Sequence, residues 1–302
     1  MPAPKLSIVL PTYNRAAILG RAITSALAQT ERDIELIVVD DGSTDGTEEF
    51  FQAISDARLR YLRYSPNRGG NHARNRGIEV AGASIVSFLD SDDEFLPQKA
   101  SVVLDFFTKH PEIDGLLDSH VLVRNDAQTS LRERKNPDDL DPASVRRRIF
   151  QGALAKPTPA ISVRKKALLD IGMFDETLRR RQDLDLLVRL SRNHACACIS
   201  TVLWRKHWVG DAISAERGTF VEAMLAICDR HPEYVERPDY RIGLERDIVG
   251  HFAKLAAGSH IRLICRDIAR LRRDGRIRMP PLRLWRRGAR VFWRTLIGPR
   301  EG

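Results

Sequence analysis

The chain has 302 residues, of which 43% are hydrophobic, so it can bury the core of one large α/β domain or of a domain with appendages. Its apolar runs are far shorter than the roughly 18 residues that cross a bilayer, and its first residues lack the apolar segment of a signal peptide. The formal charge of +9 is uneven, since residues 250–302 carry 14 Lys and Arg against 3 Asp and Glu, which indicates an anionic surface as a neighbour.

The first ninety residues alternate between segments typical of strands and segments typical of helices. Short apolar runs predict buried strands at 6–10 and 84–90, and further strands are predicted at 35–39 and 58–64. Helical spacing predicts helices at 16–28 and 44–54, and a third helix that ends near Gly82. This alternation predicts an α/β fold with a doubly wound, mainly parallel sheet and helices on both faces.

Polar clusters directly follow three of these strands. They are Thr12-Tyr13-Asn14-Arg15, Asp40-Asp41-Gly42-Ser43 and Asp90-Ser91-Asp92-Asp93. Ligands of such sheets bind beyond the carboxyl ends of the strands, so we expect the three turns to converge on one rim.

After residue 112 the alternation becomes less regular. The sequence predicts a strand within 113–123, a mobile polar loop at 125–143, a strand with a short helix within 159–176, a helix over 181–194 and mainly helical structure from 215 onward.

The aspartates that close the fourth strand require an explanation, because like charges repel one another at the end of a core strand. Asp90 and Asp92 are two residues apart and can face one pocket, where their oxygens suit Mg²⁺ or Mn²⁺. Such a cation removes the repulsion and bridges to phosphate oxygens, so a nucleotide or diphosphate ligand follows. The alternative is that Asp93 caps the next helix, which leaves Asp90 unexplained.

The turn at 41–52 partly resembles a calcium-binding loop. However, Gln52 stands where the loop requires a bidentate Glu, and the flanking elements are a strand and a helix. We therefore interpret it as a strand-to-helix turn that leaves Asp40 and Asp41 free to accept hydrogen bonds from a base or ribose.

Five stretches together resemble the family 2 glycosyltransferases of the GT-A fold. They occur in the family's order and spacing over roughly residues 5–210 and read IVLPTYNR, VVDDGSTDGT, NRGGNHARNRGIEVAGASIVSFLDSDD, GMFDE and RQDLDLLVRL. The resemblance implies a GT-A domain at 1–214, with a nucleotide-sugar half at about 1–112 and an acceptor half at about 113–214. A helical, basic extension at 215–302 would follow.

The resemblance also implies roles for individual residues. Nucleotide-sugar binding would fall to Pro11, Thr12, Tyr13, Arg15, Asp40, Asp41, Arg74, Asp90 and Ser91. Asp90 and Asp92 correspond to the two ends of the DxD motif, and Asp92 would hold Mn²⁺ or Mg²⁺ on the diphosphate. His207 matches a late histidine that often joins the metal or the phosphates, and a structural histidine is the open alternative.

Asp183 occupies the place of the family's catalytic base. Gln182 stands where Glu is usual, which leaves the base in place and changes its surroundings. The alternative is an exposed helical aspartate or a helix cap beside the arginines at 179–181. A carboxylate base and a metal-stabilised leaving group suit transfer to an alcohol with inversion.

The expected activity is transfer of a sugar from a nucleotide sugar, with a UDP-sugar as the expected donor. The acceptor would be a hydroxyl of a saccharide or lipid-linked molecule, as in cell-surface polysaccharide assembly, framed by the loop at 125–158 and the segment after 175. Three alternatives stay open: a nucleotidyltransferase-like enzyme that releases pyrophosphate, a catalytically silent nucleotide-sugar binder, and an adaptor that binds membranes or nucleic acid through its basic segment.

Residues 281–297 predict an amphipathic helix. On a helical projection an apolar sector lies opposite a basic one, formed respectively by Trp285, Ala289, Phe292, Leu296 and by Arg283, Arg287, Arg290, Arg294. This pattern suits an anionic membrane surface, although the stripe can equally pack on the protein itself. No nucleic-acid partner is expected, since no reading helix or aromatic sheet is evident. The four cysteines lack zinc-site spacing, and we expect a cytoplasmic protein, at most peripheral at the inner face of the cell membrane.

Overall fold

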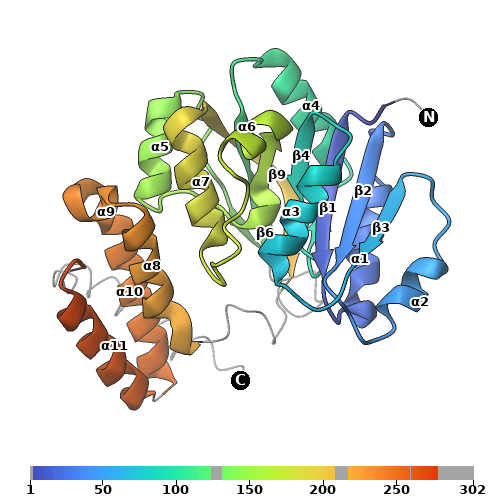
Figure 1. Cartoon of the computed structure of the whole chain (residues 1–302). Coiled ribbons are helices and arrows are strands. Elements are labelled where there is room, and N and C mark those ends of the chain that lie inside the picture. The colour runs from blue at the N-terminus through green and yellow to red at the C-terminus, as the bar shows by residue number, and fades with distance from the viewer. Residues whose placement is uncertain (1–2, 124–130, 208–216, 259, 278–302) are drawn as a thin grey trace, which may run out of the picture. The chain divides into compact units, whose positions relative to one another are not determined.

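The structure is a computed structural model that describes residues 3–123, 131–207, 217–258 and 260–277. It contains two compact units. Unit 1 comprises Met1–Arg146 with Leu154–Val209, and unit 2 comprises Arg147–Ala153 with Gly210–Gly302. Figure 1 labels their helices and strands.

Four parallel strands and three helices form the first part of unit 1. They are β1 Leu6–Thr12, α1 Ala16–Leu27, β2 Ile34–Asp40, α2 Thr47–Gln52, β3 Leu59–Arg63, α3 Gly70–Val80 and β4 Ile85–Phe88. β1 pairs in parallel with β2 and β4, and β2 pairs in parallel with β3. The predicted alternation is therefore confirmed. Helix α2 begins at Thr47 and not at residue 44, because Asp45 accepts the Thr47 backbone N–H at 3.1 Å and closes a turn before the helix.

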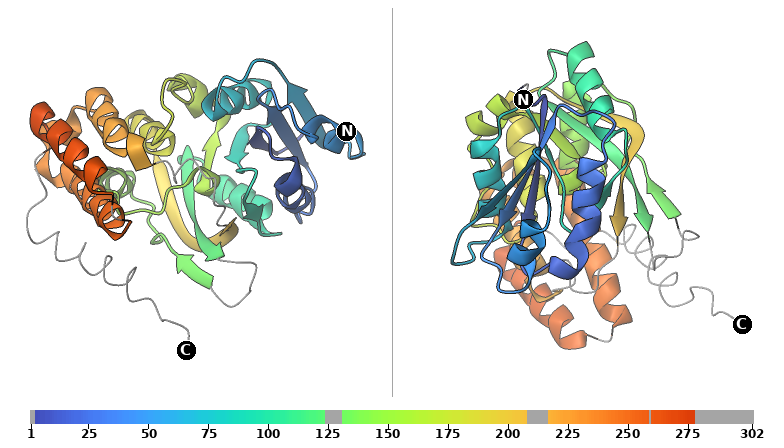
Figure 2. Two further views of the ribbon diagram at one scale, coloured as in Figure 1. Left: turned by 90° about the horizontal axis from the view of Figure 1, so that it is seen from below. Right: turned by 90° about the vertical axis from the view of Figure 1, so that its right-hand side faces the viewer.

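Alternate side chains of β1 contact helices on opposite faces of the sheet. Ile8 and Leu10 belong to the core cluster that includes Leu19 of α1. Val9 faces the other side, where a Cβ atom added to Gly77 of α3 would lie only 2.4 Å from the Val9 side chain. Figure 2 shows helices on both sides of these strands. A residue larger than glycine would push α3 away from the sheet.

The rest of unit 1 extends the sheet with strands of mixed direction. Its elements are β5 Glu94–Phe95, α4 Lys99–Lys109, β6 Gly115–Val123, β7 Leu131–Arg134, α5 Pro142–Phe150, β8 Ile161–Arg164, α6 Lys165–Asp170, α7 Gln182–Asn193 and β9 Cys196–His207. The residues of α5 from Arg147 onward belong to unit 2. β8 is antiparallel to β4 and β6, whereas β9 is parallel to β6. The strand order is β3-β2-β1-β4-β8-β6-β9-β5, with β7 paired to β6.

Part of the segment that we predicted to be a mobile loop is regular structure. Residues 131–134 form β7, which pairs antiparallel with β6, and α5 begins at Pro142. The side chains of residues 132–134 are exposed and polar, so the segment lacks the apolar alternation that identifies a half-buried strand. Its pairing depends on backbone hydrogen bonds, which side-chain patterns do not reveal.

Unit 2 is helical in its described residues, as predicted for the chain from 215 onward. It contains α8 Phe220–Arg230, α9 Glu233–Glu236, α10 Pro238–Ala257 and α11 Ile261–Asp274. Its core includes Met224, Leu244 and Leu271, and the ring of Phe150 stacks on Tyr240 at a centroid distance of 4.2 Å. Among the described residues, no helix combines the length and the apolar character that crossing a bilayer requires. The predicted amphipathic helix at 281–297 lies outside the described residues.

Candidate active site at the carboxyl ends of the strands

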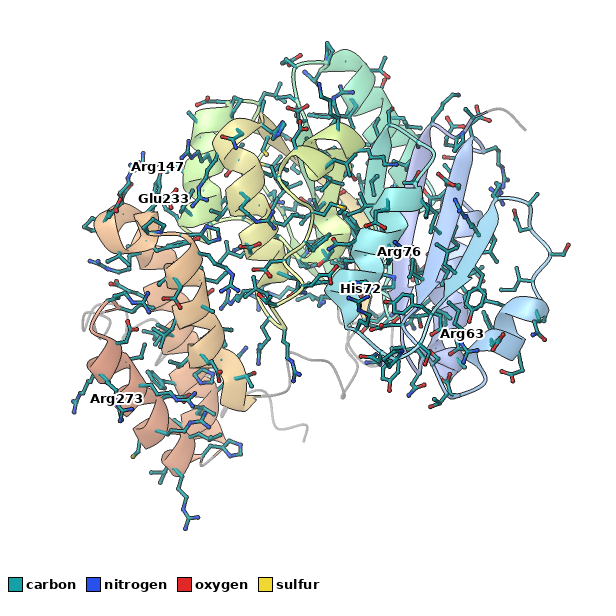
Figure 3. The ribbon with its side chains drawn as sticks, in the orientation of Figure 1. Arg63, His72, Arg76, Arg147, Glu233 and Arg273 are labelled. Carbon is teal, nitrogen blue, oxygen red and sulfur yellow. The ribbon has the colours of Figure 1, made fainter. Side chains whose placement is uncertain are left out.

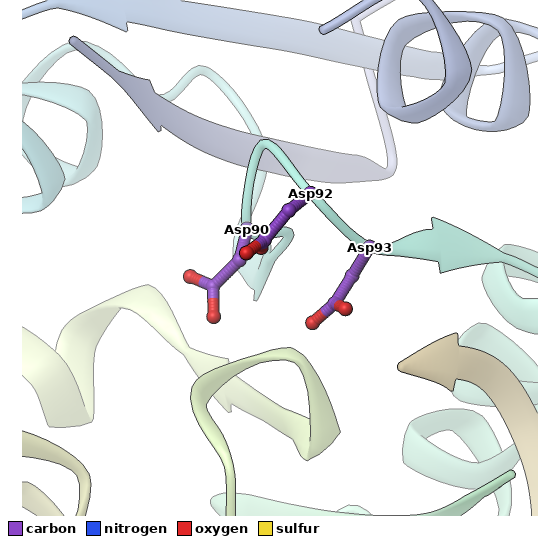
Figure 4. A group of neighbouring side chains, drawn as sticks. All are labelled: Asp90, Asp92 and Asp93. Atoms are coloured by element: carbon purple, nitrogen blue, oxygen red, sulfur yellow. The ribbon is translucent and has the colours of Figure 1, made fainter. Parts of the chain in front are cut away.

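Three aspartates meet directly after β4. One carboxylate oxygen from each of Asp90, Asp92 and Asp93 lies within 4.8 Å of the other two, with Ser91 half-buried between them. Figure 4 shows the three side chains on the same side of the connecting turn. The turn is tight, because the backbone N–H of Asp93 donates to the carbonyl of Asp90 at 3.1 Å. A short turn after a buried strand thus gathers three carboxylates.

Distant parts of the chain hold this turn. Arg74 of α3 donates from Nη2 to Oδ1 of Asp90 at 2.8 Å. On β9, the backbone N–H of His207 donates to Oδ1 of Asp93 at 3.0 Å. The aspartates are therefore fixed from both halves of unit 1.

The surroundings of the cluster do not fully compensate its negative charge. Burial, followed by the charge of Asp90, raises the pKa of Asp92. Burial raises the pKa of Asp93 well above its usual value, against the lowering effect of Lys206. Asp93 is fully buried, and its Oδ2 has no hydrogen-bond partner among the described residues. Three oxygen ligands, one of them unsatisfied, fit the preference of Mg²⁺ and Mn²⁺ for hard oxygen donors.

The interpretation of Asp93 as a helix cap is wrong. β5 follows it directly, and the N-cap position of α4 is Gln98. Its burial within the cluster, where it accepts a hydrogen bond from β9, accounts for it instead.

The turn after β1 adds polar groups near the aspartates. Arg15 is close enough to Asp92 for its charge to oppose the rise in the pKa of that carboxyl. Thr12 is buried, and its Oγ1 has no hydrogen-bond partner in the described part of the chain. Pro11 is partly buried, whereas the ring of Tyr13 is 45% exposed. An orphaned hydroxyl beside an exposed aromatic ring suits a polar ligand with a flat face.

The carboxylates after β2, those of Asp40 and Asp41, accept hydrogen bonds from other parts of the protein. Oδ1 of Asp40 accepts the Ser43 backbone N–H at 2.9 Å, and its Oδ2 accepts the Tyr61 hydroxyl at 2.6 Å. The two oxygens of Asp41 each accept one backbone N–H, from residues 68 and 69, at 2.7 Å. Both residues therefore brace neighbouring loops, and a ligand would share their oxygens with these bonds.

Asp183 lies in another element, helix α7, and acts electrostatically on the same lysine as the three aspartates. It lies in the first turn of α7, half-buried, and its Oδ1 accepts the Leu184 backbone N–H at 2.7 Å. Burial lowers the pKa of Lys206, but the charges of Asp93, Asp90, Asp92 and Asp183 together raise it above its usual value. Since one ammonium group interacts with all four carboxylates, Asp183 lies near the cluster.

Three polar side chains of α3 hold the segment that leads to α7. Asn71 donates from Nδ2 to two carbonyls of the segment 174–178, at 2.8 and 2.6 Å. Asn75 exchanges two hydrogen bonds of 2.9 Å with the backbone of the same segment. His72, labelled in Figure 3, lies with Nδ1 3.0 Å from a carboxylate oxygen of Glu176. α3 thus positions both the aspartate turn and the approach to Asp183.

The family model described as "Glycosyl transferase family 2" matches residues 7–172, more than half of the chain. The chain belongs to glycosyl transferase family 2. The predicted resemblance to this family is confirmed.

Curated relatives in family 2 match over part of their length. An uncharacterized glycosyltransferase of Nostoc sp. is 31% identical over 176 residues, which cover 57% of this chain and 54% of that protein. A Campylobacter jejuni protein named GalNAc(5)-diNAcBac-PP-undecaprenol beta-1,3-glucosyltransferase is 39% identical over 104 residues, 33% of this chain and 34% of that protein. The chain thus spans about half or less of these relatives.

A solved structure confirms the predicted GT-A-like fold. Residues 1–349 of TarS from S. aureus, in complex with UDP-GlcNAc, superimpose with a TM-score of 0.62 and 21% identity, covering 75% of this chain and 66% of that one. At this identity the likeness speaks for the fold alone.

Two adjacent residues of strand β9 in this family 2 protein, Lys206 and His207, have different surroundings. Nε2 of His207 lies 3.2 Å from Oε2 of Glu94, and Arg205 donates to the other oxygen of Glu94 at 2.8 Å. His207 is outside the acidic cluster, so its role as a metal ligand stays a prediction. Lys206, which our sequence analysis did not single out, has the carboxylates as its electrostatic neighbours. Alternate residues of a strand point to the same face, so the position of Lys206 two residues after the buried Trp204 is the signal that could have identified Lys206.

The buried polar face of α3 also escaped the sequence analysis. Asn71, His72 and Asn75 are almost fully buried, although their residue types are usually exposed. These three residues are spaced i, i+1 and i+4, so they share one face of the helix. Polar residues on one face indicate buried hydrogen bonds, but the sequence does not identify the partners.

Proposed function

We propose that the protein is an inverting, metal-dependent glycosyltransferase that moves a sugar from a nucleotide sugar to a hydroxyl group. The observation that carries the proposal is the cluster of Asp90, Asp92 and Asp93 directly after β4, whose charges, together with that of Asp183, act on Lys206. The family assignment supports the reaction class. The UDP-GlcNAc complex of TarS supports a UDP-sugar as the donor.

Asp90, Asp92 and Asp93 would hold Mn²⁺ or Mg²⁺. When bound, the cation neutralises charge that develops on the diphosphate leaving group. Arg74 keeps Asp90 in place through the bond at 2.8 Å. The nucleotide sugar would lie between this turn and the two other turns of the rim, in contact with residues of the set Pro11, Thr12, Tyr13, Arg15, Asp40, Asp41, Arg74, Asp90 and Ser91.

Asp183 would act as the base. It takes the proton of the acceptor hydroxyl while the hydroxyl oxygen bonds to the anomeric carbon and the bond from that carbon to the diphosphate breaks. A single displacement inverts the configuration at this carbon. A positioned carboxylate base contributes on the order of 10²- to 10⁴-fold to such a step.

We further propose a lipid-linked or saccharide acceptor and an enzyme that works at the cytoplasmic face of a membrane. The name of the Campylobacter jejuni relative contains an undecaprenol diphosphate, and the C-terminal basic charge suits anionic headgroups. We also propose that the glycosyltransferase domain ends at about residue 214 and that its nucleotide-sugar half ends at about residue 112.

A panel of nucleotide sugars, with Mn²⁺ or with chelator, tests the proposal. We expect Mn²⁺-dependent thermal stabilisation by one donor and its slow hydrolysis to a nucleoside diphosphate. Asp92→Asn should lose both effects, and Asp105→Asn on the exposed face of α4 should keep them. Release of pyrophosphate would indicate a nucleotidyltransferase instead, and donor binding without any transfer or hydrolysis would indicate a silent binder.

A further inference from the structure

We propose that Lys206 binds the diphosphate of the donor, beside the cation held by the three aspartates. The inference rests on the proposed function and adds a residue to it.

Strand geometry places the Lys206 side chain on the face of the site. Alternate residues of a strand point to opposite faces. Arg205 and His207 both contact Glu94, so their side chains share one face of β9. Lys206 therefore points to the other face, together with Trp204, which stacks on a neighbouring ring of β6.

The backbone next to Lys206 is bonded to the aspartate turn. Oδ1 of Asp93 accepts the N–H of His207 at 3.0 Å, which ties this end of β9 to the cluster. The charges of the four site carboxylates all act on the Lys206 ammonium group and raise its pKa, against the effect of burial. The Lys206 side chain is thus within electrostatic range of the site carboxylates.

The ammonium group is not committed to any one carboxylate. Within the ranges that the structure describes, Lys206 makes no side-chain hydrogen bond or ion pair, and its three N–H donors remain for a ligand. Oδ2 of Asp93 likewise has no donor there. A built site with both an uncommitted cation and an uncommitted buried anion suits a ligand that brings a metal and an anion together.

Charge balance favours a phosphate contact for Lys206. The carboxylates of the rim repel an anionic diphosphate, and Arg74 already donates to Asp90. A direct, charge-assisted hydrogen bond offsets this repulsion. It also strengthens as negative charge develops on the leaving oxygen.

Calorimetric titration at saturating Mn²⁺ tests the inference. The ligands are uridine and UDP, or the nucleoside diphosphate that the wild-type protein binds best with its nucleoside. Lys206→Met should weaken diphosphate binding by roughly 10- to 100-fold, the size expected for a hydrogen bond to a charged group, and leave nucleoside binding unchanged. Lys206→Arg should recover most of the affinity, and Lys109→Met, on the exposed face of α4, should behave like wild type.

Two outcomes overturn the inference. Wild-type diphosphate affinity in Lys206→Met, with tighter Mn²⁺ binding, would make Lys206 only a counter-ion of the aspartates. Equal loss of nucleoside and diphosphate binding in both Lys206 variants would make it a structural residue. A wild-type protein that binds no nucleoside diphosphate would instead refute the proposed function, and with it the basis for this contact.

Discussion

The guanidinium of Arg74 donates to Oδ1 of Asp90 at 2.8 Å and lies over the ring of Phe174, 5.6 Å from its centroid. One side chain of α3 therefore contacts both the aspartate turn and the segment that leads to α7. The same helix positions the groups proposed to hold the cation and the residue proposed as the base.

Loss of the contact between Arg74 and Asp90 should lower the stability of the metal-free protein. Arg74→Met leaves the charge of Asp90 without its partner, and we expect the free energy of unfolding to fall by about 1–3 kcal/mol. Saturating Mn²⁺ should restore part of the loss. Urea denaturation measures both effects.

Arg76→Met is the matched control, since the ion pair of Arg76 with Glu79 on the same helix is exposed. Its cost should stay below about 0.5 kcal/mol. Equal losses in the two variants would contradict a special role for the contact between Arg74 and Asp90.

Asp183→Asn separates catalysis from donor binding. The amide oxygen can still accept the Leu184 N–H, so the start of α7 should keep its geometry. We expect kcat to fall by about 10²- to 10⁴-fold and the affinity for the nucleoside diphosphate to stay within experimental error. Kinetics with the best donor and calorimetry on the same preparation give the two values, and a variant with undiminished kcat would remove Asp183 from the mechanism.

Lys99 of α4 and Asp118 of β6 form a buried charge pair. Both side chains are fully buried, and Nζ of Lys99 also donates to the carbonyl of Pro159 at 2.9 Å. Burial raises the pKa of Asp118 to about 6. Asp118→Asn leaves a buried lysine without a counter-charge and should cost about 3–5 kcal/mol of unfolding free energy.

Replacing both partners should recover most of that loss. The double variant Lys99→Met with Asp118→Leu contains no buried charge at this position. Denaturation of the two single variants and the double variant completes the cycle. Strictly additive losses would show that the two side chains are not coupled.

His120 should make the fold sensitive to acid. Burial, assisted by the charges of Lys206, Arg134 and Lys99, lowers the pKa of His120 to about 4. The unfolded histidine titrates at about 6.5, so between these values the unfolded state binds a proton that the native state does not. Native stability from this residue is present above about pH 6.5 and is lost as the pH falls.

The test compares His120→Gln with wild type. From about pH 7 to about pH 5, the wild-type protein should lose about 1–2 kcal/mol more unfolding free energy than the variant. Asp118, whose raised pKa acts in the opposite direction, is present in both proteins and cancels in the difference. Identical pH profiles would show that His120 does not titrate differently on unfolding.

The sequence revealed the elements that are defined by their own side chains. β1, β2 and β4 are nearly continuous apolar runs because both faces of these strands are buried. The aspartates after β4 were evident because charge follows such a run without a break. The rim could then be inferred, since parallel strands bring their carboxyl ends to one edge.

Features that depend on contacts between distant parts of the chain could not be predicted from the sequence. Lys206 faces the aspartates only because of the register of β9 with β5 and β6. The asparagines of α3 find their partners about 100 residues later in the chain. β7 is a strand through backbone pairing with β6. In each case the decisive contact is absent from the local pattern of residues.

The glycine at position 77 has a consequence for how such a protein can diversify. It lets α3 rest directly on Val9, so the thickness of one helix–sheet layer sets the height of Arg74 and the two asparagines above the rim. A side chain there would displace the groups of α3 that hold both the aspartate turn and the segment that leads to α7. We therefore expect differences between similar proteins to lie in surface segments that can change length without moving this helix.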